Sequence, residues 1–229
     1  MNSDFPINDF QEQLEYLLQT EELTFKTIRL KKHQNVYLYG DRAEAIYFIQ
    51  RGLVKLLVTS PEGNDAIIAI CASGQMFGES CLATKIARTE TATAMENTVL
   101  RWIPSSVFLS HLNQYSLIEN FVQYLISRLI AHQQFIARII TLDSEHVLGW
   151  TLLSMSQRLG KPDPPNSRVA YRLTHAELSE MVGTTRPRIT KFMRKFRQLG
   201  LIDLTAERFL LVNETKLLDY LVGLDSSSK

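Results

Sequence analysis

Residues 174–200 read THAELSEMVGTTRPRITKFMRKFRQLG, and this stretch decides the fold of the C-terminal part of the chain. Thr174 and Glu177 have the spacing of a capping box, in which each side chain binds a free backbone amide at a helix start. Gly183 is expected to end this first helix and Gly200 a second one, because glycine adopts the left-handed conformation that closes helices. Two helices joined by a glycine turn predict a helix-turn-helix.

The second helix of this pair combines an apolar face with cationic faces. Thr184 or Thr185 is expected to cap it, and Pro187 is tolerated in its first turn. Apolar residues recur at helical spacing: Ile189, Phe192, Met193, Phe196 and Leu199. The remaining faces carry six cations and no acid: Arg186, Arg188, Lys191, Arg194, Lys195 and Arg197. On a helical wheel Pro187, Lys191 and Arg194 point directly away from the apolar face. Because clustered cations bind DNA phosphates by releasing counterions, we expect this helix to enter the major groove.

Two short strands are predicted directly behind the cationic helix. Residues 201–204 and 209–212 are apolar, and residues 205–208 form the turn between them. A final short helix follows over residues 213–221. The pair of strands forms a wing, which makes the whole a winged helix-turn-helix.

The N-terminal part has a different pattern, with short β-rich runs separated by glycine. The runs cover residues 36–39, 45–50, 53–59, 66–70 and 91–103. Five glycines recur at a spacing of roughly 11 residues, which predicts antiparallel strands joined by tight turns in a roll or barrel. They are Gly40, Gly52, Gly63, Gly74 and Gly78. Residues 5–25, before the roll, have the pattern of an acidic helix.

A long helix is predicted between the two parts, over residues 116–141. Apolar residues and one histidine step by four and three along it: Ile118, Val122, Leu125, Leu129, His132, Ile136 and Ile139. Further apolar residues widen this seam: Phe121, Ile126, Ile130, Phe135 and Ile140. A helix with two apolar surfaces needs two partners, and we expect its own β-domain on one and a second copy of the chain on the other. The alternative is a core helix inside a monomer.

Asp143 begins a further helix that runs to Leu159. Residues 160–166 are rich in proline and predict a loop, and residues 169–173 predict a short strand. The expected fold is α+β. It consists of a β-roll sensor domain in residues 1–115, a dimerisation helix in residues 116–142 and a winged helix-turn-helix domain in residues 143–229.

The composition, 45% hydrophobic and 21% charged, is that of a folded protein, and the net charge is only +1. A nucleic-acid partner therefore has to be inferred from local clusters of charge. Cys71 and Cys81 form no CxxC pair and favour reduced thiols in a cytoplasmic compartment. The N-terminus has no signal-peptide pattern, and no stretch is apolar enough to span a membrane. The histidines lack zinc spacing, and no phosphate loop or nucleophile elbow predicts an enzyme.

Several short motifs, taken with the order of these parts, point to one family. They are Gly40-Asp41, YFIQRG at residues 47–52, Glu62-Gly63, GQMFGE at residues 74–79, and residues 173–201. On these motifs nearly the whole chain resembles the Crp/Fnr (cyclic-AMP receptor protein / fumarate-nitrate regulator) superfamily of bacterial transcription regulators. The resemblance implies a β-roll of the cyclic-nucleotide-binding type, a central dimerisation helix and a C-terminal winged helix-turn-helix. It also implies three partners: double-stranded DNA with a two-fold symmetric operator, a second copy of the chain, and RNA polymerase.

Family members that bind cyclic nucleotides use a glycine-glutamate pair and a later arginine followed by serine or threonine. The corresponding residues here are Gly78, Glu79, Arg88 and Thr89. The resemblance implies that Glu79 accepts a hydrogen bond from the ribose 2′-hydroxyl and that Arg88 pairs with the cyclic phosphate. Thr89 and backbone amides would complete the anion site.

Three features of the chain depart from that pattern. The loop at residues 81–87 is one residue shorter, Glu90 follows the arginine-threonine pair, and His132 and Gln133 occupy the base-reading positions of the central helix. A cyclic nucleotide, another small ligand, and an empty roll in which the glutamate and arginine pair with each other all remain open. Two cysteines cannot hold an iron–sulfur cluster of the four-cysteine kind, and haem is not expected.

The resemblance maps the principal base-reading positions onto Arg186, Pro187 and Lys191. Arg186 suits a bidentate contact to guanine, whereas Pro187 offers only an apolar contact. Phosphate contacts are expected from Thr174, Thr185, Arg188, Arg194 and Lys195. The alternative is a small-molecule sensor whose winged helix binds a protein instead of DNA.

Overall fold

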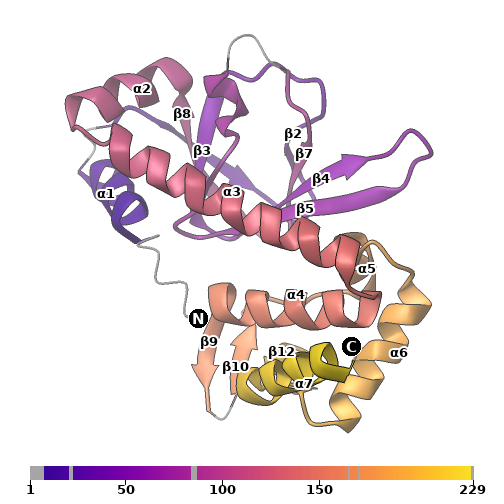
Figure 1. The fold of residues 1–229 in the computed structure, drawn as a ribbon. Coiled ribbons are helices and arrows are strands. Elements are labelled where there is room, and N and C mark those ends of the chain that lie inside the picture. Colours follow the sequence, from indigo (N-terminus) through magenta and orange to yellow (C-terminus); the bar gives the residue numbers. More distant parts are fainter. Residues whose placement is uncertain (1–7, 21–22, 84–86, 165, 170, 228–229) are drawn as a thin grey trace. The chain divides into compact units, whose positions relative to one another are not determined.

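A computed structural model describes residues 8–20, 23–83, 87–164, 166–169 and 171–227 (Figure 1). The chain forms two compact units, residues 1–133 and 134–229. The division falls within a single long helix, α3 (Ile118–Thr141). The predicted division into three segments, with boundaries at residues 115 and 142, stays a prediction.

The N-terminal unit is a β-roll with helices at one end (Figure 1). One antiparallel sheet has the order β1-β8-β3-β6 and the other the order β2-β7-β4-β5. The strands are β1 (Lys26–Leu30), β2 (Asn35–Tyr37), β3 (Ala45–Arg51), β4 (Leu53–Thr59), β5 (Asp65–Ala72), β6 (Met76–Phe77), β7 (Thr91–Ala94) and β8 (Thr98–Pro104). The helical elements are α1 (Asn8–Gln19), the 3₁₀ turn η1 (Glu79–Leu82) and α2 (Ser105–Gln114).

Two apolar clusters stabilise this unit. One lies inside the roll and includes Ile49, Val54, Phe77 and Leu100, all nearly inaccessible to solvent. The other joins the helices to the sheet. Its members include Phe10, Leu14, Ile46, Phe108, Phe121 and Tyr124. Burial of such side chains contributes roughly 1.5–3 kcal/mol each, so α1, α2 and the start of α3 are integral parts of the roll.

The predicted roll is confirmed, but three of its details were wrong. The run predicted as one strand over residues 91–103 is two strands, β7 and β8, separated by residues 95–97. Strand β1 and helix α2 were not predicted. β1 is a short run that is defined by its pairing with β8, about 70 residues later. The first helix covers Asn8–Gln19 instead of residues 5–25, and residues 5–7 and 21–22 lie outside the described part.

Helix α3 has one buried face and one exposed apolar face. Phe121 and Tyr124 are buried against the roll, and Leu125 packs beside them. The exposed apolar residues are Ile118, Val122, Ile126, Leu129, Ile136, Ile139 and Ile140, each with at least 43% of its surface accessible. Leu125 therefore belongs to the buried face and not to the exposed seam that the spacing predicted.

The C-terminal unit surrounds α4 (Ser144–Leu159), which is capped by the side chain of Asp143 through hydrogen bonds from the amides of Glu145 and His146. The other elements are α5 (His175–Val182), α6 (Arg186–Gln198), α7 (Glu214–Ser227) and a sheet of order β11-β12-β10-β9. Its strands are β9 (Gly160–Asp163), β10 (Asn166–Val169), β11 (Ile202–Leu204) and β12 (Leu210–Val212).

The proline-rich segment is a hairpin, not the predicted loop. Residues of β9 pair with β10 in register from Gly160↔Val169 to Asp163↔Asn166. Pro162 is accommodated because β9 is the edge strand of the sheet, where a missing amide costs no ladder bond. The strand predicted at residues 169–173 contains only Val169; residues 171–173 are not in a strand, and residue 170 lies outside the described residues.

Candidate nucleic-acid interface

Helices α5 and α6 form the predicted helix-turn-helix. The capping box is confirmed: the Glu177 amide donates to Thr174 Oγ1 at 3.1 Å, and the Thr174 amide donates to Glu177 Oε2 at 2.9 Å. Gly183 closes α5 with φ 69°, where a residue with a Cβ would be strained. Thr185 occupies the N-cap position of α6 without a side-chain cap bond. This geometry fixes the angle at which α6 leaves α5.

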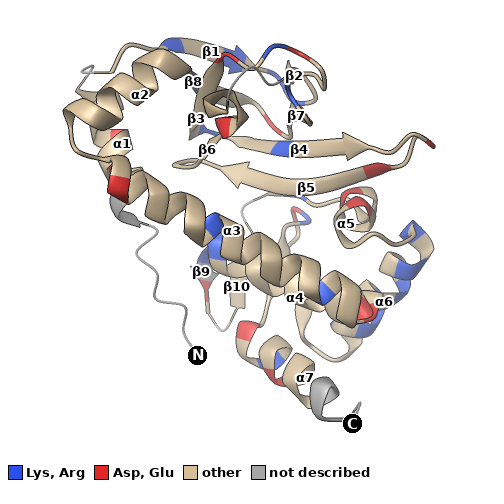
Figure 2. Ribbon diagram, turned by 45° about the horizontal axis from the view of Figure 1, so that its top comes forward, with Lys and Arg blue, Asp and Glu red and all other residues tan. Residues whose placement is uncertain are grey.

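The predicted apolar face of α6 is buried. Ile189, Phe192, Met193 and Phe196 are at most 8% accessible, whereas Leu199 is exposed. The six cations of α6 are all exposed, and Figure 2 shows them as blue segments on α6, while α5 carries acidic residues. The helix thus holds its charges outward by anchoring the opposite face.

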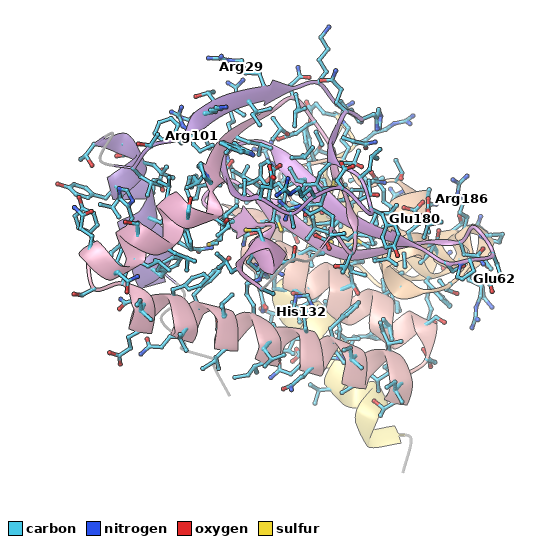
Figure 3. All side chains as sticks on the ribbon, turned by 90° about the horizontal axis from the view of Figure 1, so that it is seen from above. Arg29, Glu62, Arg101, His132, Glu180 and Arg186 are labelled. Carbon is cyan, nitrogen blue, oxygen red and sulfur yellow. The ribbon has the colours of Figure 1, made fainter. Side chains whose placement is uncertain are left out.

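The start of α6 presents cations that have no acidic partner among the described residues. Arg186, which Figure 3 labels, and the neighbouring Pro187, Arg188 and Lys191 are exposed. Within the described residues none of these cations, nor Arg194, forms an ion pair. An unpaired, solvated cation is available to an anionic partner without breaking an existing contact.

Lys195 differs from the other cations of α6. Its Nζ lies 2.6 Å from Glu145 Oε1, and the same oxygen accepts a hydrogen bond from the Tyr220 hydroxyl at 2.6 Å. The hydrogen bond to Glu145, followed by that to Tyr220, raises the pKa of Lys195 above its ordinary value. Lys195 therefore joins α6 to α4 and α7, and this role competes with the phosphate contact expected from the sequence.

A groove of about 840 Å³ runs beside α6 toward the wing. Its cationic lining residues are Arg194, Arg197 and Lys216, Asp203 is its acid, and His175 also lines it. Arg197 pairs with Asp203 at 3.3 Å, and both side chains are more than half exposed. Arg197 and Lys216 were not among the expected contact residues. Lys216 comes from α7, and only the fold brings it beside α6.

The wing carries a second group of cations that the sequence did not single out. The guanidinium carbons of Arg168 and Arg172 lie 5.6 and 5.4 Å from the ring centre of Phe209. Arg208 sits at the wing turn with φ 66°. Arg168 comes from β10 and Arg172 from the segment before α5, so only the fold brings these two arginines to the wing.

In the roll, Arg88 is the centre of the predicted ligand residues, and it is 2% accessible. Its Nη1 donates to the carbonyl of Gly78 at 2.7 Å, and its Nη2 donates to the carbonyl of Ala45 at 2.7 Å. The guanidinium carbon lies 4.2 Å from the ring centre of Tyr37. Arg88 Nε is buried and has no hydrogen-bond partner among the described residues.

Gly78 is required beside this arginine. It has φ 84°, and a Cβ there would lie 2.9 Å from Arg88 Nη1. The fold thus brings Gly78, Arg88 and Thr89 together as the family resemblance implied. It places Glu90, which the sequence marked as a departure from the family pattern, on Thr89, and it adds Tyr37, which the sequence did not single out.

Glu90 is a buried carboxylate, 7% accessible, with both oxygens bonded inside the roll. Its Oε1 accepts from the Tyr37 hydroxyl at 2.6 Å and its Oε2 from the Thr89 hydroxyl at 2.6 Å. Burial, and then the hydrogen bond to Glu90, raises the pKa of the Tyr37 phenol far above its ordinary value. Tyr37 therefore remains a hydrogen-bond donor to Glu90 throughout the physiological range.

Glu79 forms its ion pair with Arg128 of α3, at 2.5 Å between Oε1 and Nη1. The predicted alternative of an internal pair between Glu79 and Arg88 is therefore wrong. Burial disfavours the charge on Arg128, but Glu79 and, to a smaller extent, Tyr124 and Cys71 together outweigh it, and the pKa of Arg128 is raised. His132 and Gln133 are exposed on α3, and it is Arg128 that connects this helix to the ligand residues of the roll.

The two cysteines differ in environment. Cys71 is buried, whereas Cys81 is partly exposed, and burial raises the pKa of the Cys81 thiol to about 11. Among the described residues, no group of three His, Cys, Asp or Glu side chains is placed to hold a metal ion. In the same part of the chain, no helix has the length and apolar character needed to cross a membrane.

Two family models match the chain, one for each unit's characteristic fold. The model described as cyclic nucleotide-binding domain matches residues 27–115, and the model described as Crp-like helix-turn-helix domain matches residues 148–220. Together they include the roll and the helix pair α5–α6.

Curated relatives and solved structures agree with these models. The CRP-like cAMP-activated global transcriptional regulator of Mycobacterium tuberculosis is 27% identical over 191 residues, 80% of this chain and 82% of that protein. The global nitrogen regulator of Synechocystis is 25% identical over 189 residues, 81% and 84% of the two chains. The structure of FixK2 from Bradyrhizobium japonicum has a TM-score of 0.76 at 16% identity and covers 86% of this chain and 97% of its own. A CooA variant from Carboxydothermus hydrogenoformans has a TM-score of 0.72 at 19% identity, covering 96% and 98%.

Proposed function

The chain belongs to the Crp/Fnr superfamily of transcription regulators, and from this premise we propose that it acts as a homodimer that reads a two-fold symmetric operator with helix α6. One observation carries the proposal. The second helix of the helix-turn-helix holds its apolar face buried and presents exposed cations without a single acid. A solvated helix that served solubility alone would mix both signs of charge.

The exposed cations are proposed to have separate tasks. Arg186 and Lys191 read base edges, because they lie near the helix start and form no ion pair with any residue that the structure describes; Pro187 between them makes apolar contacts only. Arg188, Arg194, Thr185 and Thr174 contact phosphates, which position the protein without reading sequence. Lys195 holds α6 against Glu145 instead.

The groove beside α6 supplies a further phosphate contact. A helix in the major groove has a phosphate strand on each flank. On the flank toward the wing, Arg197 and Lys216 line a groove of about 840 Å³. The exposed pair of Arg197 with Asp203 is weak enough to exchange for a phosphate.

The dimer is proposed to form through the exposed apolar face of α3. Seven large aliphatic residues on one helix are accessible in the single chain. An apolar surface of this length is uncommon on a monomer. A second copy of α3 would cover it and bring two α6 helices to adjacent turns of DNA. RNA polymerase is a further partner predicted from the family.

The test is the salt dependence of binding to a mixed-sequence duplex, measured by fluorescence anisotropy. We expect affinity to fall steeply with salt, and Arg194→Gln to lower the slope of log affinity against log salt by about 1. Arg29→Gln in β1, also exposed and labelled in Figure 3, is the matched control and leaves the slope unchanged. A wild-type chain without affinity for duplex DNA at low salt would contradict the proposal and favour a protein partner.

A further inference from the structure

A cyclic phosphate bound in the roll would need a guanidinium with two adjacent free N–H groups, a free hydroxyl, and no other anion beside it. The motif residues Arg88 and Thr89 supply the right side chains. Their surroundings decide whether those groups are free.

The Arg88 guanidinium is already engaged. Nη1 and Nη2 each donate to a backbone carbonyl at 2.7 Å, from Gly78 and Ala45. Nη1 also donates to the Ser80 hydroxyl at 3.3 Å, so that among the described residues the N–H groups left over are that of Nε and one of the two on Nη2. The ring of Tyr37 lies 4.2 Å away, and the side chain is 2% accessible. In this arrangement Arg88 ties η1 to β3, and its guanidinium is covered by Tyr37 and closed off from solvent.

The Thr89 hydroxyl also has a partner inside the roll, and that partner is a carboxylate. Thr89 donates its hydroxyl to Glu90, and Tyr37 donates to the other Glu90 oxygen. The Glu90 carboxylate is held by two hydrogen bonds of 2.6 Å, and Tyr37, which donates one of them, also covers the Arg88 guanidinium with its ring. A cyclic phosphate entering here would place a second negative charge in the cluster that already holds Glu90. Two like charges sharing one site disfavour each other strongly.

One oxygen of the acid that would accept from the ribose is engaged as well, while Glu79 Oε2 is buried and has no hydrogen-bond partner among the described residues. Glu79 pairs with Arg128 of α3 at 2.5 Å. Arg88, Thr89 and one oxygen of Glu79 thus have internal partners, which come from segments as distant as Tyr37 and Arg128.

We propose that Glu90 is a built-in anion that takes the place of the nucleotide phosphate, so that this roll is closed to cyclic nucleotides and Arg88 serves to hold the roll together. The inference concerns regulation and rests on the proposed function only in treating the chain as a DNA-binding regulator. Its consequence is that DNA binding by this chain is independent of cyclic nucleotides.

Isothermal titration of the full chain with cyclic AMP and with cyclic GMP tests the inference. The expected result is no binding heat at micromolar nucleotide and no change in the melting temperature. Micromolar binding by the wild-type chain that is lost in Arg88→Gln would overturn it. If Arg88→Gln does not fold, micromolar binding by the wild-type chain alone is sufficient to overturn it.

The Glu90→Gln variant tests whether Glu90 is the group that excludes cyclic nucleotides from the roll. It removes the charge and keeps the size of the side chain, and we expect nucleotide affinity to rise at least about tenfold, into the measurable range. The matched control is Glu62→Gln, an exposed acid at the turn between β4 and β5 (Figure 3), which should gain nothing. If Glu90→Gln folds and still shows no nucleotide binding, Glu90 is not the group that excludes the nucleotide, and the assignment fails.

The outcome is separable from the proposed function. DNA affinity measured without nucleotide tests the regulator, whereas nucleotide titration in the absence of DNA tests the roll. A chain that binds DNA and also binds cyclic AMP through Arg88 would refute this inference alone.

Discussion

Arg88 in the roll and Arg186 at the start of α6 are both arginines of family motifs, yet the fold treats them in opposite ways. Arg88 is 2% accessible and donates to two backbone carbonyls, while Arg186 is exposed and forms no ion pair within the described residues. A motif predicts where a charge lies along the chain. The neighbours that the fold supplies decide whether that charge is bonded inside the protein or is available to a binding partner.

The same contrast holds within α6 itself. Lys195 is tied to Glu145, while Arg194, the residue before it, is exposed and unpaired in the described part of the chain. The difference arises because Lys195 faces the start of α4, and Arg194 faces the groove toward the wing. Position on the helix, not residue type, separates a structural cation from an available one.

The largest expected effect comes from separating the two copies of α6. Leu129→Asp combined with Ile136→Asp places charges on the exposed face of α3 and should give a monomer. Affinity for a symmetric operator should fall by about 10²–10⁴-fold, because the second helix no longer binds at a high effective concentration. Sedimentation velocity and anisotropy measure the two changes. A double variant that remains dimeric would show that another surface forms the dimer.

Arg88→Gln tests the inward-facing arginine. Loss of its bonds to the Gly78 and Ala45 carbonyls in a buried site should lower the free energy of unfolding by about 2–4 kcal/mol. Urea denaturation measures this change. DNA affinity, corrected for the folded fraction, should stay at the wild-type value. A variant as stable as wild type would mean that Arg88 is held for a ligand.

Arg186→Gln tests the outward-facing arginine and should give the reverse pattern. Stability should change by less than about 0.5 kcal/mol, since the side chain is exposed. Affinity for the preferred operator should fall by about 1–3 kcal/mol, and discrimination should be lost at one base step of each half-site. Equal loss at every position would instead make Arg186 a phosphate contact.

Arg194→Gln and Lys195→Gln form a neighbouring pair that differs in its partners. The first should lower the salt slope of DNA binding by about 1 without changing stability. The second should keep most of the slope and lower the melting temperature by a few degrees, since Glu145 loses its ion pair and the Tyr220 ring loses the ammonium group above it. If both variants reduced the slope alike, Lys195 would exchange Glu145 for a phosphate on binding.

Cys81 gives the smallest effect. Because burial raises the pKa of its thiol to about 11, the neutral form is favoured in the folded chain, and this preference is lost as the pH rises toward 11. At pH 8 its thiolate fraction should be about 100-fold below that of an unfolded chain. Alkylation by iodoacetamide should be slowed to match, with Cys81→Ser giving the background from Cys71. Alkylation of Cys81 at pH 8 as fast as in the unfolded chain would contradict the raised pKa of its thiol.

The helix pair could be predicted from sequence because its signals are local. The capping box joins residues three positions apart, and the apolar face of α6 repeats within 13 residues. The glycine spacing likewise indicated a roll. What failed was non-local: β1 is defined by β8, and the β9–β10 hairpin by the edge of a sheet that also contains β12.

The candidate sites follow the same rule. Residue positions were predicted, but their partners were not, since Tyr37 reaches Glu90 across 53 residues and Lys195 reaches Glu145 across 50. Spacing along one helix can show that Lys195 is cationic and lies beside the outward face. The same spacing cannot show that the Glu145 carboxylate of α4 lies next to Lys195 in the fold.

The most direct measurement is selection of bound duplexes from a random DNA pool by the full chain, without added nucleotide. If α6 reads the major groove in a two-fold dimer, the enriched sequence will be an inverted repeat whose half-sites lie about 34 Å apart, one helical turn. Arg186→Gln will change the preferred base at one symmetric pair of positions. A pool that remains random, or a single half-site without symmetry, would contradict the account.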